Sequence, residues 1–595
     1  MPNQGQNQTP RPAQRRSAAS ANSTVTVRET YEMIGPILVI VGTLTGNASA
    51  ADAPLHIGSG KQLFVGPWTA DGRDAHLVAS MKGIEMTMHE ARVTGEKLIV
   101  QDRPWEGKGI LDMRQFVLKD GDRFRMYYAA LPFHFVSADA PKGKQYANLW
   151  KRPYQRILCY AESSDGIHWS KPNLGLCEWN GSRQNNILLP NDALEYVFSE
   201  VEGASVFIDP KAKRPDEKYK MFVKMTPVGK GGTEQKGPIP RMGTKSLPKA
   251  QRAFASADAI HWRLLSTKKM NPGSSSDTQY SVFWDDRVGK YVQYTRIKVR
   301  NKPQMAYYKK LYDGYEGRTT DLHVGRAVSD DFLKWSKEQT VLKPDAIDQA
   351  NAPPGLTRMD FYGGNVSRYA EAPAIYIALP NAYYHWKFDM TRKWWTGKHI
   401  QLPSTMDVQL VTSRDGIHWH RTLGRRPFIR LGPTGTFWSG TIWPDGNAIR
   451  VGDELWFFFA GLSVGHKEQS LVRSVGARGR AVLRLDGFVS ARAAYTGGEL
   501  ITKPVVFAGS SLQLNVDTSA GGTVKVEMLD ASGKPIDGFT EADSDEINGN
   551  HIRVFVTWRG RPDVGALAGK PVRLRFVMRD TDLYAFRFVP AERLQ

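Results

Sequence analysis

The heptad Ser-Ser-Asp-Gly-Ile-His-Trp at Ser163–Trp169 returns in related form at Ser256–Trp262, Ser329–Trp335 and Ser413–Trp419, with the pattern Ser-x-Asp-x-(Ile/Leu)-x-Trp. Each copy follows a short β-like run, so Ser and Asp are expected to close a turn while the apolar residue and Trp start the next strand. The copies are spaced widely enough for one four-stranded sheet each. Sheets of this kind, repeated around an axis, form a β-propeller. We expect the heptads themselves to be turns and not functional sites.

A second repeat, of strand, turn and strand, predicts the inner hairpin of each sheet. The first copy covers Leu111–Ala129, with its turn at Asp120-Gly121-Asp122. Matching units lie at Val206–Lys224, Ser281–Thr295, Val366–Leu379 and Ile442–Ala460. There is one more hairpin than there are heptads. We therefore predict a five-bladed propeller whose fifth sheet is completed by N-terminal strands near Ala91–Gln101, which closes the ring and protects its edges.

The segments before and after this repeat differ from it in composition. Residues 1–30 are rich in Gln, Asn, Ser, Pro and Arg and are predicted to be disordered. The apolar run Met33–Leu44 is too short to span a bilayer and precedes Ala48-Ser49-Ala50, as in a signal peptide, although a buried strand is the alternative. The long basic stretch before it also fits an over-extended gene start. We predict a leader and signal peptide over 1–50 and a secreted or periplasmic protein without a membrane segment after cleavage.

The remaining organisation follows from the strand patterns. Residues 51–483 are assigned to the propeller. Residues 484–595 contain short alternating strands separated by Gly, Pro and Asp turns, which predict an accessory β-sandwich. The fold class is thus all-β, and the sequence does not set the oligomeric state.

The composition narrows the chemistry. Cys159 and Cys177 fit either a disulfide in an exported protein or two buried thiols. No Cys/His spacing suited to a metal occurs, so we predict no metal and no cofactor. The formal charge of +20 is not accompanied by a nucleic-acid-binding motif, which argues against a nucleic-acid partner. Sixteen Trp and 22 Tyr suit either a propeller interior or sugar binding.

Acidic residues recur where the innermost strands begin. Asp112 and Asp277 each lie five residues before a valine, Val117 and Val282, which places them at the same register in two sheets. Such positions near the axis would be apolar if packing alone decided. We therefore predict that Asp112 and Asp277 face a common central pocket.

Two further sheets carry acids in the equivalent stretch. The second has Glu200 and Glu202, and the fourth has Asp360. We expect Asp112, Glu202, Asp277 and Asp360 to line one pocket, where crowding of like charges would raise the pKa of one of them. The alternative is that each acid caps a turn or binds a backbone amide.

These features together resemble the five-bladed propeller glycosidases of the invertase, levanase and arabinanase type, nearest to uncharacterised secreted bacterial members, over about residues 90–595. The resemblance implies glycoside hydrolysis, which needs one ionised and one protonated carboxyl. By position it implies Asp112 as nucleophile or base, Asp277 or Asp360 as orienting acid and Glu202 as general acid. The chain departs from the invertase pattern, because Trp105-Glu106 precedes Asp112 without the Trp-x-Asn-Asp-Pro-Asn stretch and the second sheet lacks Arg-Asp-Pro.

The predicted partner is a carbohydrate substrate. Side chains near the acids are assigned to sugar binding: Arg114, Gln279, Tyr362, Trp386, Trp105, Glu200 and Asp407. A non-catalytic carbohydrate-binding propeller, whose acids only accept hydrogen bonds from sugar hydroxyls, is the main alternative. A sialidase is less favoured, because its turn motif has one more residue before Trp and no triad of inner-strand arginines is evident.

The connections between the second and third strands are predicted at residues 135–153, 226–252, 298–318 and 382–404. They hold most of the excess positive charge, together with many Tyr and Trp. Because Arg grips carboxylate or sulfate bidentately and a cationic rim concentrates anions, we predict a sulfated or uronate-containing glycan. Solvated loops that only keep the protein soluble are the alternative.

Overall fold

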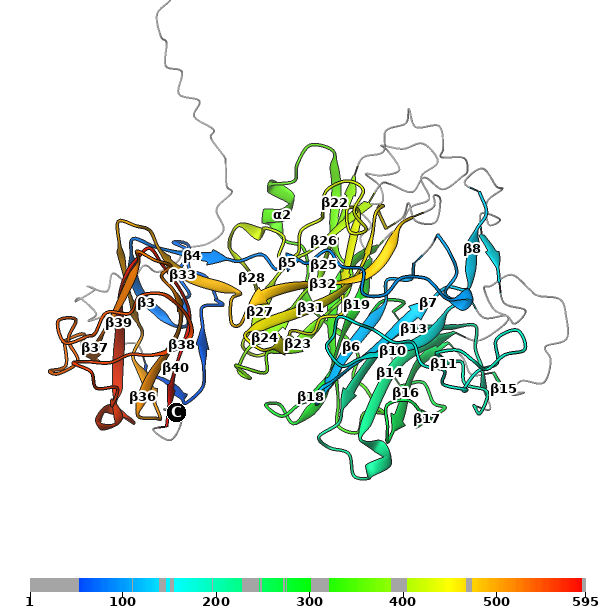
Figure 1. Ribbon diagram of the computed structural model, residues 1–595, viewed down its shortest axis with the longest axis horizontal. Coiled ribbons are helices and arrows are strands. Elements are labelled where there is room, and N and C mark those ends of the chain that lie inside the picture. The colour runs from blue at the N-terminus through cyan, green and yellow to red at the C-terminus, as the bar shows by residue number, and fades with distance from the viewer. Residues whose placement is uncertain are drawn as a thin grey trace, which may run out of the picture. The chain divides into compact units, whose positions relative to one another are not determined.

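The computed structural model describes residues 53–109, 111–137, 146–149, 155–194, 196–226, 245–246, 249–270, 273, 276–300, 320–386, 404–466 and 474–590. This part of the chain is nearly all β, with one short α-helix, α2 (Ala346–Ala350), and a few 3-10 turns (Figure 1). The predicted leader and signal peptide at 1–50 lie outside the described residues. No helix in the described part is long and apolar enough to cross a membrane.

Three sheets repeat one plan, in which four antiparallel strands follow one another in chain order or nearly so. The first consists of β6 (Gln115–Asp120), β7 (Arg123–Ala130), β10 (Ile157–Ser163) and β11 (Ile187–Leu189). The second consists of β13 (Glu200–Ile208), β14 (Tyr219–Thr226), β16 (Ala250–Ser256) and β17 (Arg263–Leu264). The third consists of β18 (Ser281–Asp285), β19 (Lys290–Arg300), β20 (Thr320–Ser329) and β21 (Gln339–Leu342). Two-stranded ladders flank them, formed by β8 (Phe133–Phe135) with β9 (Tyr146–Asn148) and by β12 (Tyr196–Val197) with β15 (Lys245–Ser246).

The next stretch forms two ladders where one four-stranded sheet was expected. One joins β22 (Leu356–Phe361), β25 (Asn381–Trp386) and β26 (Ser404–Val408). The other joins β23 (Val366–Arg368), β24 (Tyr376–Ala378), β27 (Val411–Ser413) and β28 (Trp419–Arg421). Beyond them follow β29 (Thr441–Pro444), β30 (Ile449–Val451), β31 (Glu454–Leu462), β32 (Gly476–Arg484) and the N-terminal β5 (Arg92–Val93), which pairs with β32.

Side chains near the first strands bind the backbone of the neighbouring sheet at repeated positions. The amide of Val282 donates to Ser205 Oγ at 3.0 Å, and the amide of Val366 donates to Ser281 Oγ at 2.9 Å. The amide of Val117, in the first sheet, donates to Asp445 Oδ2 at 3.0 Å, just after β29. These bonds join the second sheet to the third, the third to β23, and the residue after β29 to the first sheet.

The four heptads form the predicted turns. Ser163 Oγ accepts from the Gly166 amide at 2.8 Å, and Asp165 Oδ1 accepts from the amides of Ile167 and His168, both at 2.8 Å. The aspartates of the other copies, Asp258, Asp331 and Asp415, make the same pair of bonds. The strand after the turn begins at the heptad Trp only in the last copy, and later in the others.

Two six-stranded sheets follow the repeat. Their C-terminal strands are β33 (Val489–Ala493), β34 (Gly498–Thr502), β35 (Val505–Phe507), β36 (Ser511–Asp517), β37 (Thr523–Asp530), β38 (Asn550–Phe555), β39 (Pro571–Arg579) and β40 (Thr581–Val589). The N-terminal strands β1 (Leu55–Gly58), β2 (Gln62–Leu63), β3 (Val78–Lys82) and β4 (Ile84–Met88) pair with them. Residues 55–88 were predicted to belong to the propeller segment 51–483, but their strands pair with these two sheets. Their buried side chains, such as Val78 and Met86, lie in one hydrophobic cluster with residues of the C-terminal strands and of the preceding repeat.

The strand order places the connections between second and third strands where the basic loops were expected. Most of the predicted cationic and aromatic rim, over 138–145, 150–154, 227–244, 301–319 and 387–403, lies outside the described residues. Cys159, in the first sheet, and Cys177, in its neighbouring loop, are both buried thiols, which matches the buried-thiol alternative.

Candidate active site

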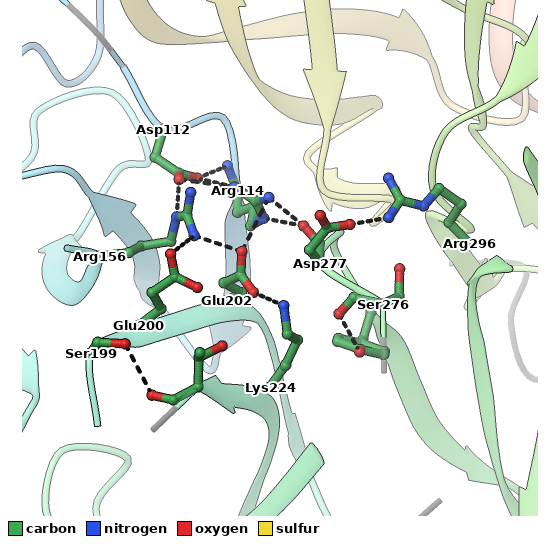
Figure 2. A network of polar contacts seen from close by, with 12 residues as sticks. Asp112, Arg114, Arg156, Ser199, Glu200, Glu202, Lys224, Ser276, Asp277 and Arg296 are labelled. Carbon is green, nitrogen blue, oxygen red and sulfur yellow. Dashed lines mark hydrogen bonds and ion pairs between the residues drawn. The ribbon is translucent and has the colours of Figure 1, made fainter. Parts of the chain in front are cut away.

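Charged side chains from the first three sheets meet in one network, which we call the axial cluster (Figure 2). Its acids and its cations come from the residues just before or within the first three strands of each sheet. The acids are Asp112, Glu200, Glu202 and Asp277, and the cations are Arg114, Arg156, Lys224 and Arg296. Arg114 links the Asp112 carboxylate to the backbone carbonyl of Asp277, so these two residues, which share a register in the sequence, take part in one network.

Arg114 spans two sheets. Its Nη1 donates to both oxygens of Asp112, at 3.0 and 2.9 Å, and its backbone amide binds Asp112 Oδ1 at 3.0 Å. Its Nε donates to the backbone carbonyl of Asp277 at 2.8 Å. Its Nη2 also lies 3.6 Å from Glu202. Arg114 had been assigned to sugar binding, but its guanidinium is already engaged by protein oxygens, so its role here is to join the acids.

Arg156 is the second bridge. Its Nε donates to Asp112 Oδ2 at 2.5 Å, and its Nη1 lies 2.6 Å from Glu202 and 3.5 Å from Glu200. Glu202 also forms an ion pair with Lys224, its partner in the β13–β14 register. Two buried carboxylates thus share three cations.

The cations determine the ionisation of the cluster. Burial by itself would raise the pKa of Asp112, but the charges of Arg114 and Arg156 outweigh it and hold this pKa well below the usual range. Burial opposes ionisation of Glu202 too, and there Arg156, Arg114 and Lys224 lower the pKa. The expectation that crowded acids raise one pKa is therefore wrong for these two residues, because cations stand between the carboxylates.

Asp277 differs from the buried acids in its exposure. Its side chain is 40% exposed, against 1% for Asp112 and 4% for Glu202. Burial raises its pKa, but Arg296, in direct ion contact, and Arg114 lower it well below the usual range. Glu200 is the other accessible acid, with its side chain 24% exposed. A ligand entering the cluster would therefore meet Asp277 and Glu200 first.

Asp360 was predicted to join these acids, but its described contacts are elsewhere. It accepts from the Leu322 amide at 3.0 Å and lies 3.0 Å from Arg358 Nη2 and 2.9 Å from His385 Nε2. Its side chain is fully buried. Among the described residues no contact joins Asp360 to the axial cluster, so the single pocket with all four predicted acids is not observed; the side chain instead ties β22 to β25 and β20.

Three predicted sugar-binding residues lie in the interior. The Gln279 amide donates to the carbonyls of Ala204 and Tyr280, at 2.5 and 3.1 Å. Trp105 Nε1 donates to Asn186 Oδ1 at 2.7 Å. Tyr362 is buried with its ring 4.3 Å from the Arg296 guanidinium. These side chains therefore contact the backbone, a buried asparagine or a cluster cation, and do not present a surface to a sugar.

The two remaining predicted residues, Trp386 and Asp407, share a different sheet, formed by β22, β25 and β26. Trp386 Nε1 donates to Thr405 Oγ1 at 3.0 Å. Burial raises the pKa of Asp407 to about 7, although Arg430 and the residue's own backbone oppose the shift. Asp407 thus has a raised pKa although it lies outside the axial cluster.

Sequence reasoning missed Arg156, Lys224 and Arg296. Lys224 could have been found, because the predicted hairpin pairs its strand with that of Glu202 and opposite charges favour facing positions. Arg156 and Arg296 contact acids of other strands or sheets, and no local pattern marks them. The described residues contain no group of three or more His, Cys, Asp or Glu side chains suited to a metal ion.

No protein-family model matches the chain, and no curated protein matches it. Solved structures with a partly similar fold include a glycoside hydrolase, 13% identical, which covers 66% of this chain and 92% of its own with a TM-score of 0.38. An N-acetylgalactosamine deacetylase from F. plautii, in complex with blood group B trisaccharide, is 13% identical over 68% of this chain and 97% of its own, with a TM-score of 0.38. A family 43 arabinoxylan arabinofuranohydrolase from Bacillus subtilis is 12% identical, and the match covers 84% of this chain and 99% of that enzyme, with a TM-score of 0.35. Likenesses this distant do not assign an activity to this chain.

Proposed function

We propose that this protein is a glycoside hydrolase that cleaves a poly- or oligosaccharide at the axial cluster. The observation that carries the proposal is the division of the cluster into two kinds of acid. Asp112 and Glu202 are buried among cations, whereas Asp277 and Glu200 are accessible, Asp277 beside Arg296 and Glu200 beside Arg156. Glycoside hydrolysis requires two carboxyl groups that reach the substrate, and Asp277 and Glu200 are the accessible carboxyls of the cluster.

Asp277 fits the ionised partner in this reaction. Arg296 and Arg114 keep it a carboxylate at neutral pH, so it can act as nucleophile or activate water. Glu200 is the candidate proton donor, because it is the other carboxyl of the cluster that is accessible to a leaving group. In the simplest form of the reaction the glycosidic C–O bond breaks as Glu200 gives its proton to the leaving oxygen. A water that gives its proton to Asp277 forms the new C–O bond at the anomeric carbon. Asp277 then loses that proton to solvent, and Glu200 takes one up from solvent.

Asp112 and Glu202 then act as positioning residues. Their carboxylates hold Arg114, Arg156 and Lys224 in place, and those cations in turn orient Asp277 and Glu200. These roles differ from those implied by the family resemblance, which gives Asp112 the nucleophilic role and Glu202 the acid role. The Asp112 and Glu202 side chains are buried, and a catalytic group must reach the substrate. Their burial therefore supports a positioning role for these two residues instead of a catalytic one.

The finer architecture belongs to the same proposal. We take the repeated sheets as a five-bladed propeller, supported by the three equivalent bonds between neighbouring sheets and by the β5–β32 pairing. The two C-terminal six-stranded sheets are proposed to be an accessory β-sandwich. Export, by the apolar run before Ala48-Ser49-Ala50, is also part of the proposal.

A non-catalytic carbohydrate-binding protein is the second candidate. The observation that favours it is that the cluster acids with shifted pKa values, Asp112, Glu202 and Asp277, are all shifted toward the carboxylate. Ionised carboxylates accept hydrogen bonds from sugar hydroxyls without any reaction.

The deciding experiment measures reducing-end release by the purified protein from a panel of neutral and anionic polysaccharides. We expect Asp277→Asn and Glu200→Gln each to lower kcat about 10²–10⁴-fold while the affinity for the substrate persists. Asp330→Asn, which changes an exposed acid in a heptad turn, is the matched control and should leave kcat unchanged. Binding of a polysaccharide without release of reducing ends from any panel member would favour the binding protein.

The charge of the substrate is proposed from the basic composition of the loops between second and third strands. A sulfated polysaccharide should bind more tightly than its neutral counterpart at low salt, and its affinity should fall as salt rises. Equal affinities for the two at low salt would remove the anionic part of the proposal and leave the hydrolase part standing.

A further inference from the structure

A cavity of about 680 Å³ lies beside α2, away from the axial cluster. One wall is apolar and contains Ala352, Pro353, Leu356 and Met359. The other is polar and comes from the ends of β25, β26 and β28. The two sites have no lining residue in common. The volume falls within the roughly 300–1,000 Å³ of pockets that hold small molecules.

The polar wall is a chain of hydrogen bonds between buried groups. Arg421 donates to Gln409 Oε1 from Nε, at 3.1 Å, and from Nη2, at 2.7 Å. Gln409 Nε2 in turn donates to Tyr384 Oη at 3.3 Å. The Gln409 side chain is buried and that of Arg421 is 7% exposed. Because each group is fixed by the next, the wall is organised before any ligand arrives.

The charged groups that line the cavity, Asp348, Arg421 and Arg425, are all paired. Arg421 forms an ion pair with Asp348, and Arg425 lies 2.9 Å from Asp348 and 2.7 Å from Asp345, which is not itself a lining residue. A charged ligand would have to disrupt these pairs at the cost of leaving a buried charge unpaired, so the cavity favours a neutral one.

The remaining lining groups combine an aromatic face with hydrogen-bonding capacity. The Tyr384 ring lies half-buried and stacks on Trp386, with 6.5 Å between ring centroids and 30° between planes. Its hydroxyl accepts from Gln409 and retains a proton to donate. Asn351, on the other side, uses its Nδ2 on the Ile347 carbonyl, which leaves its side-chain oxygen as an acceptor. Rings with apolar faces and hydroxyl edges match this combination.

Asp407 adds a polar group behind Tyr384. The β25–β26 register sets Ala382 opposite Asp407 and Tyr384 opposite Thr405, so Asp407 and Tyr384 are diagonal neighbours on one sheet face. Asp407 Oδ1 is buried without a hydrogen-bond partner among the described atoms. An unpaired buried oxygen is costly, and an ordered water beside Tyr384 would satisfy it.

We infer that the cavity beside α2 is a second saccharide-binding site, which takes a neutral glycosyl unit against Tyr384 and between Asn351 and the Gln409–Arg421 wall. This site would bind sugar whether or not the axial cluster hydrolyses it. A protein with a cluster and a separate holding site can grip one chain at two points, which raises overall affinity through effective concentration.

The test titrates the full-length protein calorimetrically with four neutral tetrasaccharides, derived from cellulose, xylan, mannan and arabinan. Ala352→Trp fills the apolar wall from an exposed position, and Ala350→Trp, on α2 but outside the cavity, is the matched control. We expect at least one tetrasaccharide to bind, Ala352→Trp to weaken that binding at least tenfold and Ala350→Trp to change it less than twofold. Met359→Trp, from β22, should reproduce the loss, with unfolding midpoints recorded for all variants.

Three results would overturn the inference. They are no binding of any tetrasaccharide, binding unaffected by both cavity-filling variants, and binding of the apolar dye ANS in the cavity that no tetrasaccharide displaces. Reducing-end release separates this inference from the proposed hydrolase. Binding that is sensitive to Ala352→Trp in a protein without hydrolytic activity would support the second site alone, and hydrolysis with no such binding would support the axial cluster alone.

Discussion

Asp112 in the axial cluster and Asp445 at the seam between β29 and β6 are both buried aspartates, with 4% and 1% of their surface exposed. Their pKa values nevertheless move in opposite directions. Arg114 and Arg156 outweigh burial at Asp112 and lower its pKa, whereas at Asp445 only backbone hydrogen bonds, from Val117 and Asn447, oppose burial, and the pKa rises to about 8. Burial alone thus does not set the state of an acid in this fold. The neighbouring guanidinium group does.

Removing a cation from the axial cluster should have the largest effect on stability. Arg156→Ala should lower the free energy of unfolding by about 3–5 kcal/mol, because it leaves Asp112 and Glu202 buried with too few positive partners. Denaturation with urea at pH 7 measures the effect. Arg123→Ala removes an exposed arginine that pairs with Glu162 at 3.2 Å and should cost no more than about 1 kcal/mol. Equal losses in the two variants would show that the cluster does not depend on its cations.

The same cations explain which parts of the site the sequence could predict. Asp112 and Asp277 were found because register within a repeat is local information. The heptad turns were found for the same reason, since Ser163 and Asp165 bond residues two or three positions away. Arg156 joins acids from two sheets, and such pairing depends on how sheets pack, which no short stretch encodes.

The predicted residues that do not face a ligand show a second limit. Gln279 has the residue type of a sugar-binding group, yet its amide is used on backbone carbonyls of the neighbouring sheet. The buried ring of Tyr362 likewise packs against the guanidinium of Arg296 and not against an open surface. Residue type and register predict that a side chain lies near the axis, but not whether it points into an opening or between sheets. Strands 55–88 were misplaced because their partners lie some 400 or more residues away in the chain, as with Ile84 and Ala493.

Asp445 should make the free energy of unfolding depend on pH. Its folded-state pKa of about 8 lies above the unfolded value of about 3.9, so the stability gained from its protonated form is fully present below pH 4 and is lost as pH rises through 8. Asp445→Asn removes this ionisation and should cost about 1 kcal/mol at pH 5, for one altered hydrogen bond. Relative to wild type, the variant should gain stability between pH 5 and pH 9.

Urea denaturation of the wild type and of Asp445→Asn at pH 5, 7 and 9 measures the difference in their free energies of unfolding. Asp330→Asn, at an exposed acid, is the control and should show a constant offset from wild type. An offset for Asp445→Asn that is the same at pH 5 and pH 9 would mean that Asp445 is already ionised in the folded protein, and that the two backbone amides suffice to hold a buried carboxylate.

Substitution of Asp165, in a heptad turn at the surface, should change the stability least. Asp165 also has a lowered pKa, but its causes are hydrogen bonds from the His168 side chain and from the His168 and Ile167 amides, with no arginine involved. Asp165→Asn keeps an oxygen for the two amides and loses only an exposed contact to His168, so it should cost no more than about 0.5 kcal/mol. Asp165→Ala removes the amide bonds as well and should cost about 1 kcal/mol. Thermal and urea unfolding of both variants at pH 7 measures the difference in stability. If Asp165→Asn were as costly as Asp165→Ala, the heptad turn would be stabilised by the carboxylate charge and not by the hydrogen bonds to the two amides.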